Sequence, residues 1–404
     1  MAYGYGFRPV RAVTYSSDGR TGVAILGSTG SIGRQTLAVI DRHSDRFKVV
    51  ALAAGHNKNL LLRQVLQYRP RLVSSASPFE AEHPQGTRGV TGPEGLIAVA
   101  TCAAADIVVV ATAGHAALVP IMHAITAGKI IALANKEAIV CAGAIILPLA
   151  VKHSVAIRPI DSEHSAIWQC LEAASARQIK RLILTASGGP FLATPAAELD
   201  CMTARDALAH PTWSMGAKTT IDSSTLMNKG LELIEAHWLF NMPISGINVV
   251  IHPESIVHSM IELCDGAVLA QLASPDMRQP IQYALTYPER LESGIRPLVL
   301  SDVGCLHFEA PDMERFPSLR LARQAGEAGG TMPTVLSAVD DVAVAAFLAG
   351  QITFGDIPTI LSTILDRHRN QPVDRIEAVL ETDAWARREA TTLINAEVKA
   401  KSAR

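Results

Sequence analysis

The sequence predicts an α/β protein made of an N-terminal parallel-sheet part, a central α+β part and a C-terminal helical part. Three observations support this fold class. Apolar, β-rich runs alternate with helical patterns from residue 22 to 159, which is typical of parallel strands joined by helices. Two alternating strand patterns separated by an Asp-Gly turn follow in the middle of the chain, and helical patterns dominate from residue 319 onward.

The N-terminal part, residues 21–160, is predicted to place its ligands at one edge of the sheet. Open parallel sheets bind ligands outside the carboxyl ends of their strands, so motifs that follow strands carry most of the functional information. The expected strands are Val23–Leu26, Val49–Ala53, Ile107–Ala111, Ile130–Ala134 and Val155–Ile160, and the expected helices are Ile32–Ile40, Leu60–Leu66, Ala116–Ile125 and Ala138–Val151.

The central part, residues 161–295, is predicted to hold a largely antiparallel sheet, with short helices and loops over 203–240. Residues 296–318 are proline-rich and predict a linker, residues 319–404 predict a helical domain, and residues 1–20 are an N-terminal extension without a signal-peptide pattern. The expected central strands are Leu182–Thr185, Asn248–Ile251, Val257–Leu263 and Val268–Leu272, and the expected C-terminal helices are Ala338–Leu348, Ile357–Leu365 and one after Asp383.

Composition restricts the classes of function. The 404 residues carry a net charge of -2, which argues against the basic face of a nucleic-acid-binding protein. Hydrophobic residues make up 49% of the chain, which excludes a disordered protein. The uncharged run from Ile107 to Gly128 is long enough to span a membrane, but its proline, glycines and histidines indicate a strand, a turn and a helix. Six widely spaced cysteines without a CxxC motif predict reduced thiols, no zinc site and a cytoplasmic location.

A glycine-rich turn, Gly27-Ser28-Thr29-Gly30-Ser31-Ile32-Gly33, joins the first strand to the first helix. Glycines at such a turn let backbone amides at the helix N-terminus approach a pyrophosphate, which predicts a Rossmann-like dinucleotide site. The spacing is GxxGxxG rather than GxGxxG, so a tight turn without a ligand stays an alternative. The cofactor contacts that we expect here are Gly27, Thr29, Gly30, Ser31, Ile32 and Gly33.

The end of the second strand indicates which nicotinamide cofactor binds. An NAD enzyme usually places an acidic residue here to hold the ribose 2′-hydroxyl, but this chain has Gly55-His56-Asn57-Lys58. These groups suit a 2′-phosphate, so the sequence predicts NADPH. The alternative is that Lys58 is a solvated residue at a helix start.

Two acidic motifs predict a divalent-metal site. Asp161-Ser162-Glu163 follows a predicted strand, and carboxylate oxygens there suit Mg²⁺ or Mn²⁺. The alternative is a helix N-cap at Asp161 or Ser162. On a helix, Asn228, Lys229 and Glu232 share one face, which fits a phosphorylated substrate near a metal, although a surface Lys–Glu pair would give the same spacing.

Two loops are candidate substrate-binding elements. Ser187-Gly188-Gly189-Pro190 ends a strand and offers a hydroxyl and backbone amides to phosphate oxygens, although an ordinary turn is equally compatible. The segment 210–216, with His210, Trp213 and Met215, predicts a lid over a ligand, or else a loop anchored by Trp213. His252 and His258 are interpreted as structural histidines.

Together these motifs resemble those of the 1-deoxy-D-xylulose 5-phosphate reductoisomerases, over nearly the whole chain from about residue 22. Several specific motifs in the same order carry the resemblance. They are GSTGSIG (27–33), LANKE (133–137), PIDSEHSAIWQ (159–169), SGGPF (187–191), HPTWSMG (210–216), MNKGLE (227–232), IHPESIVHSM (251–260) and PDMRQPIQYALTYPER (275–290).

The resemblance implies a homodimeric enzyme of the non-mevalonate isoprenoid pathway. Such an enzyme uses NADPH and Mg²⁺ or Mn²⁺ to rearrange and reduce 1-deoxy-D-xylulose 5-phosphate to 2-C-methyl-D-erythritol 4-phosphate. It implies metal ligands at Asp161, Glu163 and Glu232, with Lys136 and His210 as further catalytic residues. The implied substrate contacts are Ser162, Ser187, His210, Trp213, Met215, Ser223, Asn228 and Lys229, and the further implied cofactor contacts are Asn135, Glu137 and Gly216.

The sequence also departs from the family pattern. Ser337-Ala338-Val339-Asp340-Asp341 stands where Asn-Ala-Ala-Asn-Glu is frequent before a helix, Ala217 where a basic residue is frequent, and Glu254 where Gln is common. Two other functions therefore remain to be distinguished. One is an NADP-dependent dehydrogenase that acts on a small phosphorylated substrate without rearrangement, and the other is a dinucleotide sensor without catalysis.

Overall fold

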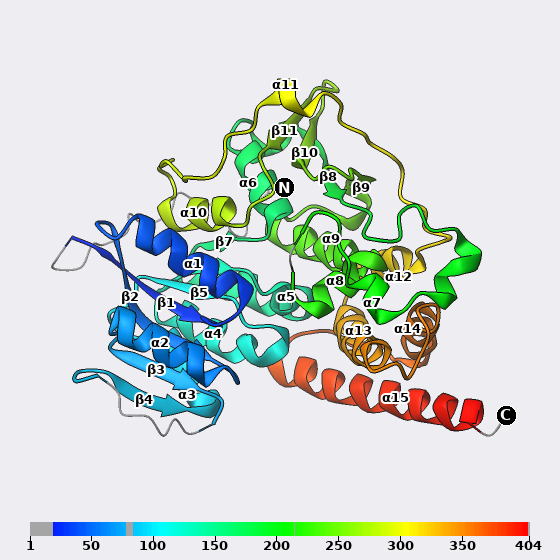
Figure 1. The fold of residues 1–404 in the computed structure, drawn as a ribbon, viewed down its shortest axis with the longest axis horizontal. Coiled ribbons are helices and arrows are strands. Elements are labelled where there is room, and N and C mark those ends of the chain that lie inside the picture. Colours follow the sequence, from blue (N-terminus) through cyan, green and yellow to red (C-terminus); the bar gives the residue numbers. More distant parts are fainter. Residues whose placement is uncertain (1–18, 78–83, 214, 403–404) are drawn as a thin grey trace.

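A computed structural model of the chain describes residues 19–77, 84–213 and 215–402 (Figure 1). Most of the predicted N-terminal extension, 1–20, lies outside these residues. The first sheet contains seven parallel strands in the order β4-β3-β2-β1-β5-β6-β7, which confirms the α/β prediction. The strands are β1 (Thr21–Leu26), β2 (Phe47–Ala54), β3 (Leu72–Ser75), β4 (Arg88–Thr91), β5 (Ile107–Val110), β6 (Ile130–Leu133) and β7 (Ile157–Pro159).

Helices cover both faces of this sheet, as the buried strands require. Strands β3 (LVSS) and β4 (RGVT) were not predicted, because neither has more than two apolar residues and β4 is mostly exposed, which leaves no apolar run to detect. The helical elements of this part are α1 (Ser31–Arg42), α2 (Lys58–Tyr68), α3 (Gly92–Ala100), η1 (Gly114–Ala117), α4 (Leu118–Thr126) and α5 (Lys136–Lys152). The strand order reverses at β1, which has β2 on one side and β5 on the other, and this reversal opens a crevice at the carboxyl ends of the strands.

The second sheet has the order β11-β10-β8-β9 and is largely antiparallel, as predicted; only β8 and β9 run parallel. Its strands are β8 (Ile179–Ala186), β9 (Ile247–Ile251), β10 (Val257–Leu263) and β11 (Val268–Leu272). The predicted hairpin joins β10 to β11, and Gly266 provides the positive φ of 89° at the turn. Helix α6 (Ser162–Leu171) packs on β10 and β11.

The stretch 203–240 is more ordered than predicted. Helix α8 (Ala217–Ser224) leads into α9 (Met227–Phe240), which is one helix of 14 residues. Gly230 lies inside α9, where a Cβ atom would collide with the Cβ of Ala322 on α12 (Pro317–Ala328). The glycine therefore allows two helices to pack closely, which offsets its low helix propensity. Shorter elements of the central part are η2 (Ala176–Gln178), η3 (Ala196–Cys201), α7 (Ala204–Ala207), η4 (Ile244–Gly246) and α10 (Arg278–Thr286).

The C-terminal part is helical, as predicted, but two helix starts differ from the prediction. The last helix begins at Ile376 rather than after Asp383, because its buried residues Val379, Ala386 and Ala390 are separated by charged ones that conceal the apolar face. Residues 337–341 lie inside a helix rather than at its start. The helices are α11 (Leu300–Val303) within the proposed linker, α12 (Pro317–Ala328), α13 (Met332–Leu348), α14 (Asp356–Arg367) and α15 (Ile376–Ser402).

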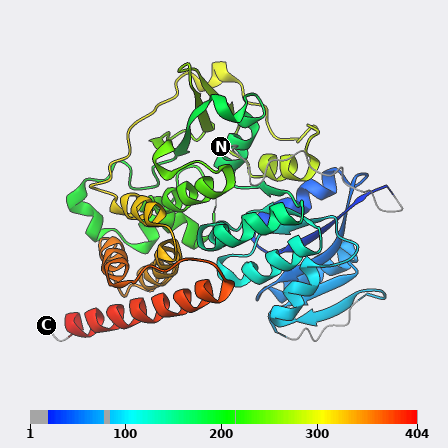
Figure 2. The ribbon, with the colours of Figure 1, turned by 180° about the vertical axis from the view of Figure 1, so that it is seen from behind.

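The parts share their apolar cores. One face of the first sheet belongs to a cluster that continues through the central and C-terminal helices, and the other face is covered partly by Ile281, Ala284 and Leu285 of α10. Helix α15 runs along one side of the molecule from the first sheet to the far end (Figure 2). None of the helices among the described residues combines the length and apolarity needed to cross a bilayer, and the six cysteines are free thiols. The domain boundaries given above stay predictions.

The glycine turn yields a test of packing. A Cβ atom on Gly33 would overlap the carbonyl oxygen of Gly27 and the backbone of Ser28, so Gly33→Ala is expected to destabilise the protein by about 1–3 kcal/mol. Gly55 has no atom within 4 Å of a built Cβ, so Gly55→Ala should change stability by less than about 0.5 kcal/mol. Denaturant unfolding of both variants measures the difference, and equal stabilities would contradict the proposed packing.

Candidate active site

A cavity of about 360 Å³ lies where the carboxyl ends of the parallel strands face the central part. It brings together most of the predicted site residues, although they come from distant segments of the chain. Those that line it are Gly30, Ser31, Ile32, Lys136, Asp161, Ser162, Glu163, Ser187, His210, Trp213, Met215, Gly216, Ser223, Asn228, Lys229 and Glu232.

Three carboxylates converge at the floor of this cavity. Asp161 follows β7, Glu163 lies in the first turn of α6, and Glu232 comes from α9. One oxygen from each carboxylate lies within 4.8 Å of the others. Asp161 occupies the N-cap position of α6, but its side chain makes no capping hydrogen bond to the described backbone. Asp161 therefore has the N-cap position that the alternative expected, but its side chain lines the cavity instead of capping the helix.

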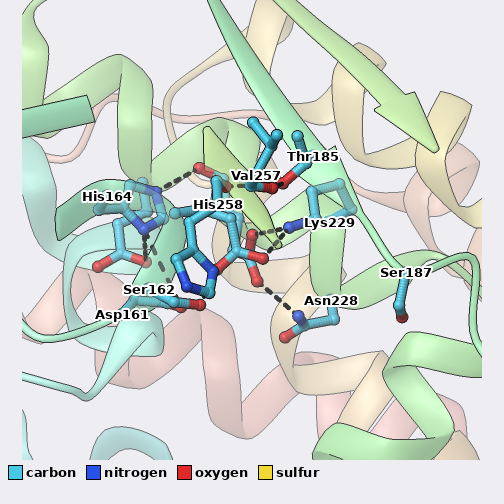
Figure 3. Close-up of polar contacts among 12 residues, drawn as sticks. Asp161, Ser162, His164, Thr185, Ser187, Asn228, Lys229, Val257 and His258 are labelled. Atoms are coloured by element: carbon cyan, nitrogen blue, oxygen red, sulfur yellow. Dashed lines mark hydrogen bonds and ion pairs between the residues drawn. The ribbon is translucent and has the colours of Figure 1, made fainter. Parts of the chain in front are cut away.

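Two lysines neutralise this acidic cluster. The ammonium group of Lys229 lies 2.6 Å from Glu163 Oε1 and also pairs with Glu232. Lys136, at the start of α5, lies 2.9 Å from Asp161 Oδ2 and 3.1 Å from Glu232 Oε1, and donates to Asn228 Oδ1 at 2.6 Å. The Lys229 and Glu232 side chains are 4% and 1% exposed, so the alternative of a surface ion pair is wrong. Figure 3 shows Asp161, Asn228, Lys229 and His258 around one space, with Ser187 farther out.

The pKa values follow from burial and from these charges. Burial alone would raise the pKa of Asp161, but Lys136 and His164 hold it below its usual range. Burial and the nearby Glu163 raise the pKa of Glu232, against the opposing effect of Lys136. Burial would lower the pKa of Lys136, yet Asp161 and Glu232 hold it well above its usual value. The neighbouring charges therefore favour the ionised forms of Asp161 and Lys136.

The donor set fits a hard divalent cation. Asp161, Glu163 and Glu232 supply carboxylate oxygens, which Mg²⁺ and Mn²⁺ prefer over nitrogen or sulfur. The buried oxygen Asp161 Oδ2 lies 2.9 Å from Lys136 Nζ and has no further partner at hydrogen-bond geometry among the described residues. A carboxylate oxygen has two lone-pair directions, so Asp161 can ligate a cation while it stays beside Lys136.

The predicted phosphate-binding residues meet at a second wall. The Ser187-Gly188-Gly189 turn follows β8, and a Cβ on Gly189 would collide with the backbone of Ser223 and Ser224 at the end of α8. Glycine therefore lets the two segments approach. Ser187 and Ser223 both line the cavity, so each of the two segments contributes a serine to it.

His210 connects the predicted lid to this turn. Its Nδ1 accepts the backbone N–H groups of Thr212 and Trp213 at 3.1 and 2.9 Å. The neutral ring therefore carries its proton on Nε2, which donates to Ser187 Oγ at 3.0 Å. Burial lowers the pKa of His210, which favours this neutral form.

The predicted cofactor residues divide into two groups. Gly30, Ser31 and Ile32 line the cavity at the start of α1, whose first turn is not capped by a side chain of the described residues, so its amides can face an anion. Gly27 adopts φ 87° beneath this turn. Gly27, Thr29, Gly33, Gly55, His56, Asn57, Lys58, Asn135 and Glu137 are not among the residues that line the cavity.

Two of these residues have local structural roles. Asn57 caps α2 by accepting the Leu60 N–H at 3.1 Å. Asn135 caps α5 by accepting the Ala138 N–H, and its amide donates to the Thr112 and Gly114 carbonyls. The Asn135 side chain is thereby occupied by the protein itself. Cofactor contacts by these residues stay predictions.

The two histidines that were interpreted as structural occupy different surroundings. His252 is structural, as predicted: its Nδ1 lies 2.8 Å from the His307 carbonyl and its Nε2 accepts two backbone N–H groups. His258 lines the cavity instead, and burial together with Lys229 lowers its pKa to about 4.

Several residues that line the cavity were not predicted. Ser255, His258 and Met277 lie within the motifs 251–260 and 275–290, which was the sequence signal that could have identified them. The other unpredicted lining residues include Gln35, Ala111, Ala113, Ala134, Thr219, Leu226 and Val257.

A dinucleotide-type parallel sheet that shares a cavity with a buried carboxylate cluster defines a nucleotide- and metal-dependent enzyme. Family models agree with this class. The model "1-deoxy-D-xylulose 5-phosphate reductoisomerase" matches residues 23–143, its C-terminal domain model matches residues 157–240, and "DXP reductoisomerase C-terminal domain" matches residues 272–389.

Curated relatives give the same answer. The reductoisomerase of Thermomicrobium roseum is 52% identical over 383 residues, which cover 94% of this chain and 99% of the relative. That of Chlorobaculum tepidum is 53% identical over 378 residues, covering 92% and 99%. The chain therefore belongs to the 1-deoxy-D-xylulose 5-phosphate reductoisomerase family.

Solved structures support the fold. A crystal structure of DOX-P reductoisomerase in complex with NADPH, fosmidomycin and magnesium has a TM-score of 0.87 and 41% identity, covering 93% of this chain and 98% of that one. The reductoisomerase from Zymomonas mobilis in complex with NADPH has a TM-score of 0.85 and 39% identity, covering 93% and 99%.

Metal binding can be tested without turnover. Glu232→Gln removes one carboxylate from the cluster, so the Kd for Mn²⁺ should rise about ten-fold or more in isothermal titration, because affinity depends on ligand charge. Glu254→Gln is the matched control, since Glu254 bonds to His307 and does not line the cavity. A similar Mn²⁺ affinity in both variants would exclude Glu232 as a ligand.

Proposed function

We propose that this chain converts 1-deoxy-D-xylulose 5-phosphate to 2-C-methyl-D-erythritol 4-phosphate with NADPH and Mg²⁺ or Mn²⁺. The observation that carries this function is the shared cavity. The start of α1 and the three carboxylates of Asp161, Glu163 and Glu232 all line it. Simple hydride transfer needs no divalent cation, so a dehydrogenase without rearrangement leaves the carboxylate cluster unexplained. A sensor without catalysis leaves both the cluster and the Ser187 and Ser223 wall unexplained.

The residues of the chain have separate roles in this reaction. A bound Mg²⁺ would supply Lewis acidity, and NADPH would supply the hydride. Asp161, Glu163 and Glu232 would hold the cation, with the ammonium groups of Lys136 and Lys229 beside them. Ser162 and Lys229 lie beside the cation site and orient the substrate hydroxyls.

The phosphate is bound away from the reacting carbons. Ser187, Ser223, Asn228 and Lys229 supply its donors, and this remote binding energy orients the reacting end of the substrate. Lys229 pairs with Glu163 and Glu232, so its charge also lies beside the acidic cluster. His210 fixes the orientation of Ser187, and Trp213 and Met215 cover the cavity and exclude water from the aldehyde intermediate.

Assembly and location form part of the proposal. We assign a homodimer in the cytoplasm, as expected for this family. The near-neutral charge of the chain gives no support for a nucleic-acid partner.

The assay that tests the function follows NADPH absorbance with 1-deoxy-D-xylulose 5-phosphate and Mg²⁺ or Mn²⁺. Oxidation should require the cation and stop when a chelator is added. Asp161→Asn and Glu232→Gln should lower kcat/KM by about a thousand-fold or more, while the Kd for NADPH stays within two-fold, because the cofactor contacts lie on other segments. Metal-independent oxidation would favour the dehydrogenase alternative, and near-normal activity of either variant would exclude the metal assignment.

Cofactor choice is tested by comparing NADPH with NADH. The wild-type protein should prefer NADPH, and Lys58→Ala should raise the KM for NADPH about ten-fold while leaving that for NADH unchanged, because only NADPH carries a 2′-phosphate. Lys152→Ala, at the far end of α5, serves as the control. Equal use of the two cofactors by the wild-type protein would contradict the proposed role of the segment 55–58.

A further inference from the structure

A series of ion pairs links the helix after the lid to the C-terminal helices. Lys218 of α8 lies 2.7 Å from Asp340 Oδ2 on α13, 2.5 Å from Asp222 Oδ2 and 3.5 Å from Asp341 Oδ1. On α15, Arg387 lies 2.6 Å from Asp341 Oδ2. Lys218 is therefore the cation that attaches α8 to the C-terminal part.

The series continues to the cofactor side of the molecule. Arg387 also pairs with Asp383 at 2.9 Å, and Asp383 lies 2.8 Å from His115 Nδ1 in η1. Element η1 follows β5, and Ala113 just before it lines the cavity. Helix α15 thus pairs with η1, which follows β5, and with α13, whose Asp340 and Asp341 pair with Lys218 of α8.

Helix α8 carries two elements of the candidate site. Gly216 at its N-terminus is the last residue of the predicted lid, and Ser223 near its C-terminus belongs to the predicted phosphate wall. Thr219 and Ser223 line the cavity, one turn apart. A rotation or shift of α8 therefore moves the lid and the phosphate wall together.

The charges around Lys218 have little freedom to rearrange. Asp340 and Asp222 are 0% and 2% exposed, and each has one carboxylate oxygen without a hydrogen-bond partner among the described residues. Burial and the adjacent Asp340 raise the pKa of Asp222. Buried carboxylates are costly without a paired cation, so Lys218 is confined to this position. Replacing a buried ion pair with apolar side chains of similar volume often leaves protein stability unchanged, so stability alone does not account for these ion pairs.

The acidic partner at 340 is a departure of this chain from the pattern that is frequent in the family. Asp stands there in place of Asn, which adds a full negative charge beside Lys218, and Asp341 in place of Glu places a shorter carboxylate between Lys218 and Arg387. Two residues of this departure, Asp340 and Asp341, thus pair directly with Lys218 of α8.

We propose that Lys218, held by Asp340 and Asp222, is a positioning residue that fixes α8 so that Ser223 engages the substrate phosphate. This inference rests on the proposed function. It assigns to Lys218 no contact with substrate, since the ammonium group is engaged by carboxylates and the residue does not line the cavity.

The test compares Lys218→Met, Lys218→Arg and Asp340→Asn with the wild-type protein. Lys218→Met should raise the KM for 1-deoxy-D-xylulose 5-phosphate about ten-fold, with kcat and the Kd for NADPH within about two-fold of wild type, because one oriented hydrogen bond to a charged group is worth that much. Lys218→Arg should restore the KM to within about three-fold, and Asp340→Asn should give an intermediate value. Lys180→Met is the control, since Lys180 forms a surface pair with Glu262.

Hydrogen exchange gives a readout independent of turnover. Amides of 217–224 should exchange faster in Lys218→Met and Asp340→Asn, while those of α9 keep the wild-type rate. An unchanged KM in a folded Lys218→Met protein, or equal losses in KM, kcat and NADPH affinity, would overturn the proposal. If Lys218→Met fails to fold, Asp340→Asn decides by the same two measurements.

Failure of the proposed function has a different signature. A wild-type protein that does not oxidise NADPH with the sugar phosphate disproves that function, whatever Lys218 does. The positioning of α8 is then measured by the Kd for inorganic phosphate and by exchange over 217–224, and no difference between the wild-type protein and Asp340→Asn in either would overturn it.

Discussion

The structure depends on the buried charge cluster in which three carboxylates meet two lysines. Asp161 and Glu163 come from the end of the parallel sheet, Glu232 and Lys229 from α9, and Lys136 from α5. Lys229 and Glu232 are buried and the other charges are largely buried, and each lies next to an opposite charge, so α5, α6 and α9 must be held in a fixed arrangement. The same condition concentrates negative charge where a divalent cation can enter.

The packing of the helices satisfies this condition. Gly230 lets α9 approach α12, and Gly189 lets the Ser187 turn approach α8. Leu226, the N-cap residue of α9, has φ 61°, a conformation that costs a residue with a side chain about 1–2 kcal/mol. This local strain lies beside the cavity, because Leu226 lines it together with Asn228 and Lys229.

Much of the fold and of the site could be predicted from the sequence. Buried strands such as Ile107–Val110 consist of apolar residues, which makes them easy to predict. The motifs around Asp161 and Asn228 were recognised from residue types a few positions apart, and the structure brings both motifs to one cavity. Short exposed strands such as β4 lack such a pattern, and the start of α15 is concealed by charged residues. The role of His258 and the contact between Lys218 and Asp340 depend on residues far apart in the sequence, which local patterns do not contain.

The apolar face covered by α10 has a consequence for how the chain can be divided. Ile281, Ala284 and Leu285 pack against Val23, Ile25 and the other residues on one side of the parallel sheet. A fragment that ended at residue 160 would keep every strand of that sheet, together with α1 and α2, and yet leave the part of this face that α10 covers open to water. Such a fragment would be prone to self-association, because a large exposed apolar surface favours aggregation. The strands of the sheet come from one continuous stretch of the sequence, but its apolar core is completed by α10, which lies more than a hundred residues downstream. The parallel-sheet part therefore depends on the central part of the chain to cover its apolar surface.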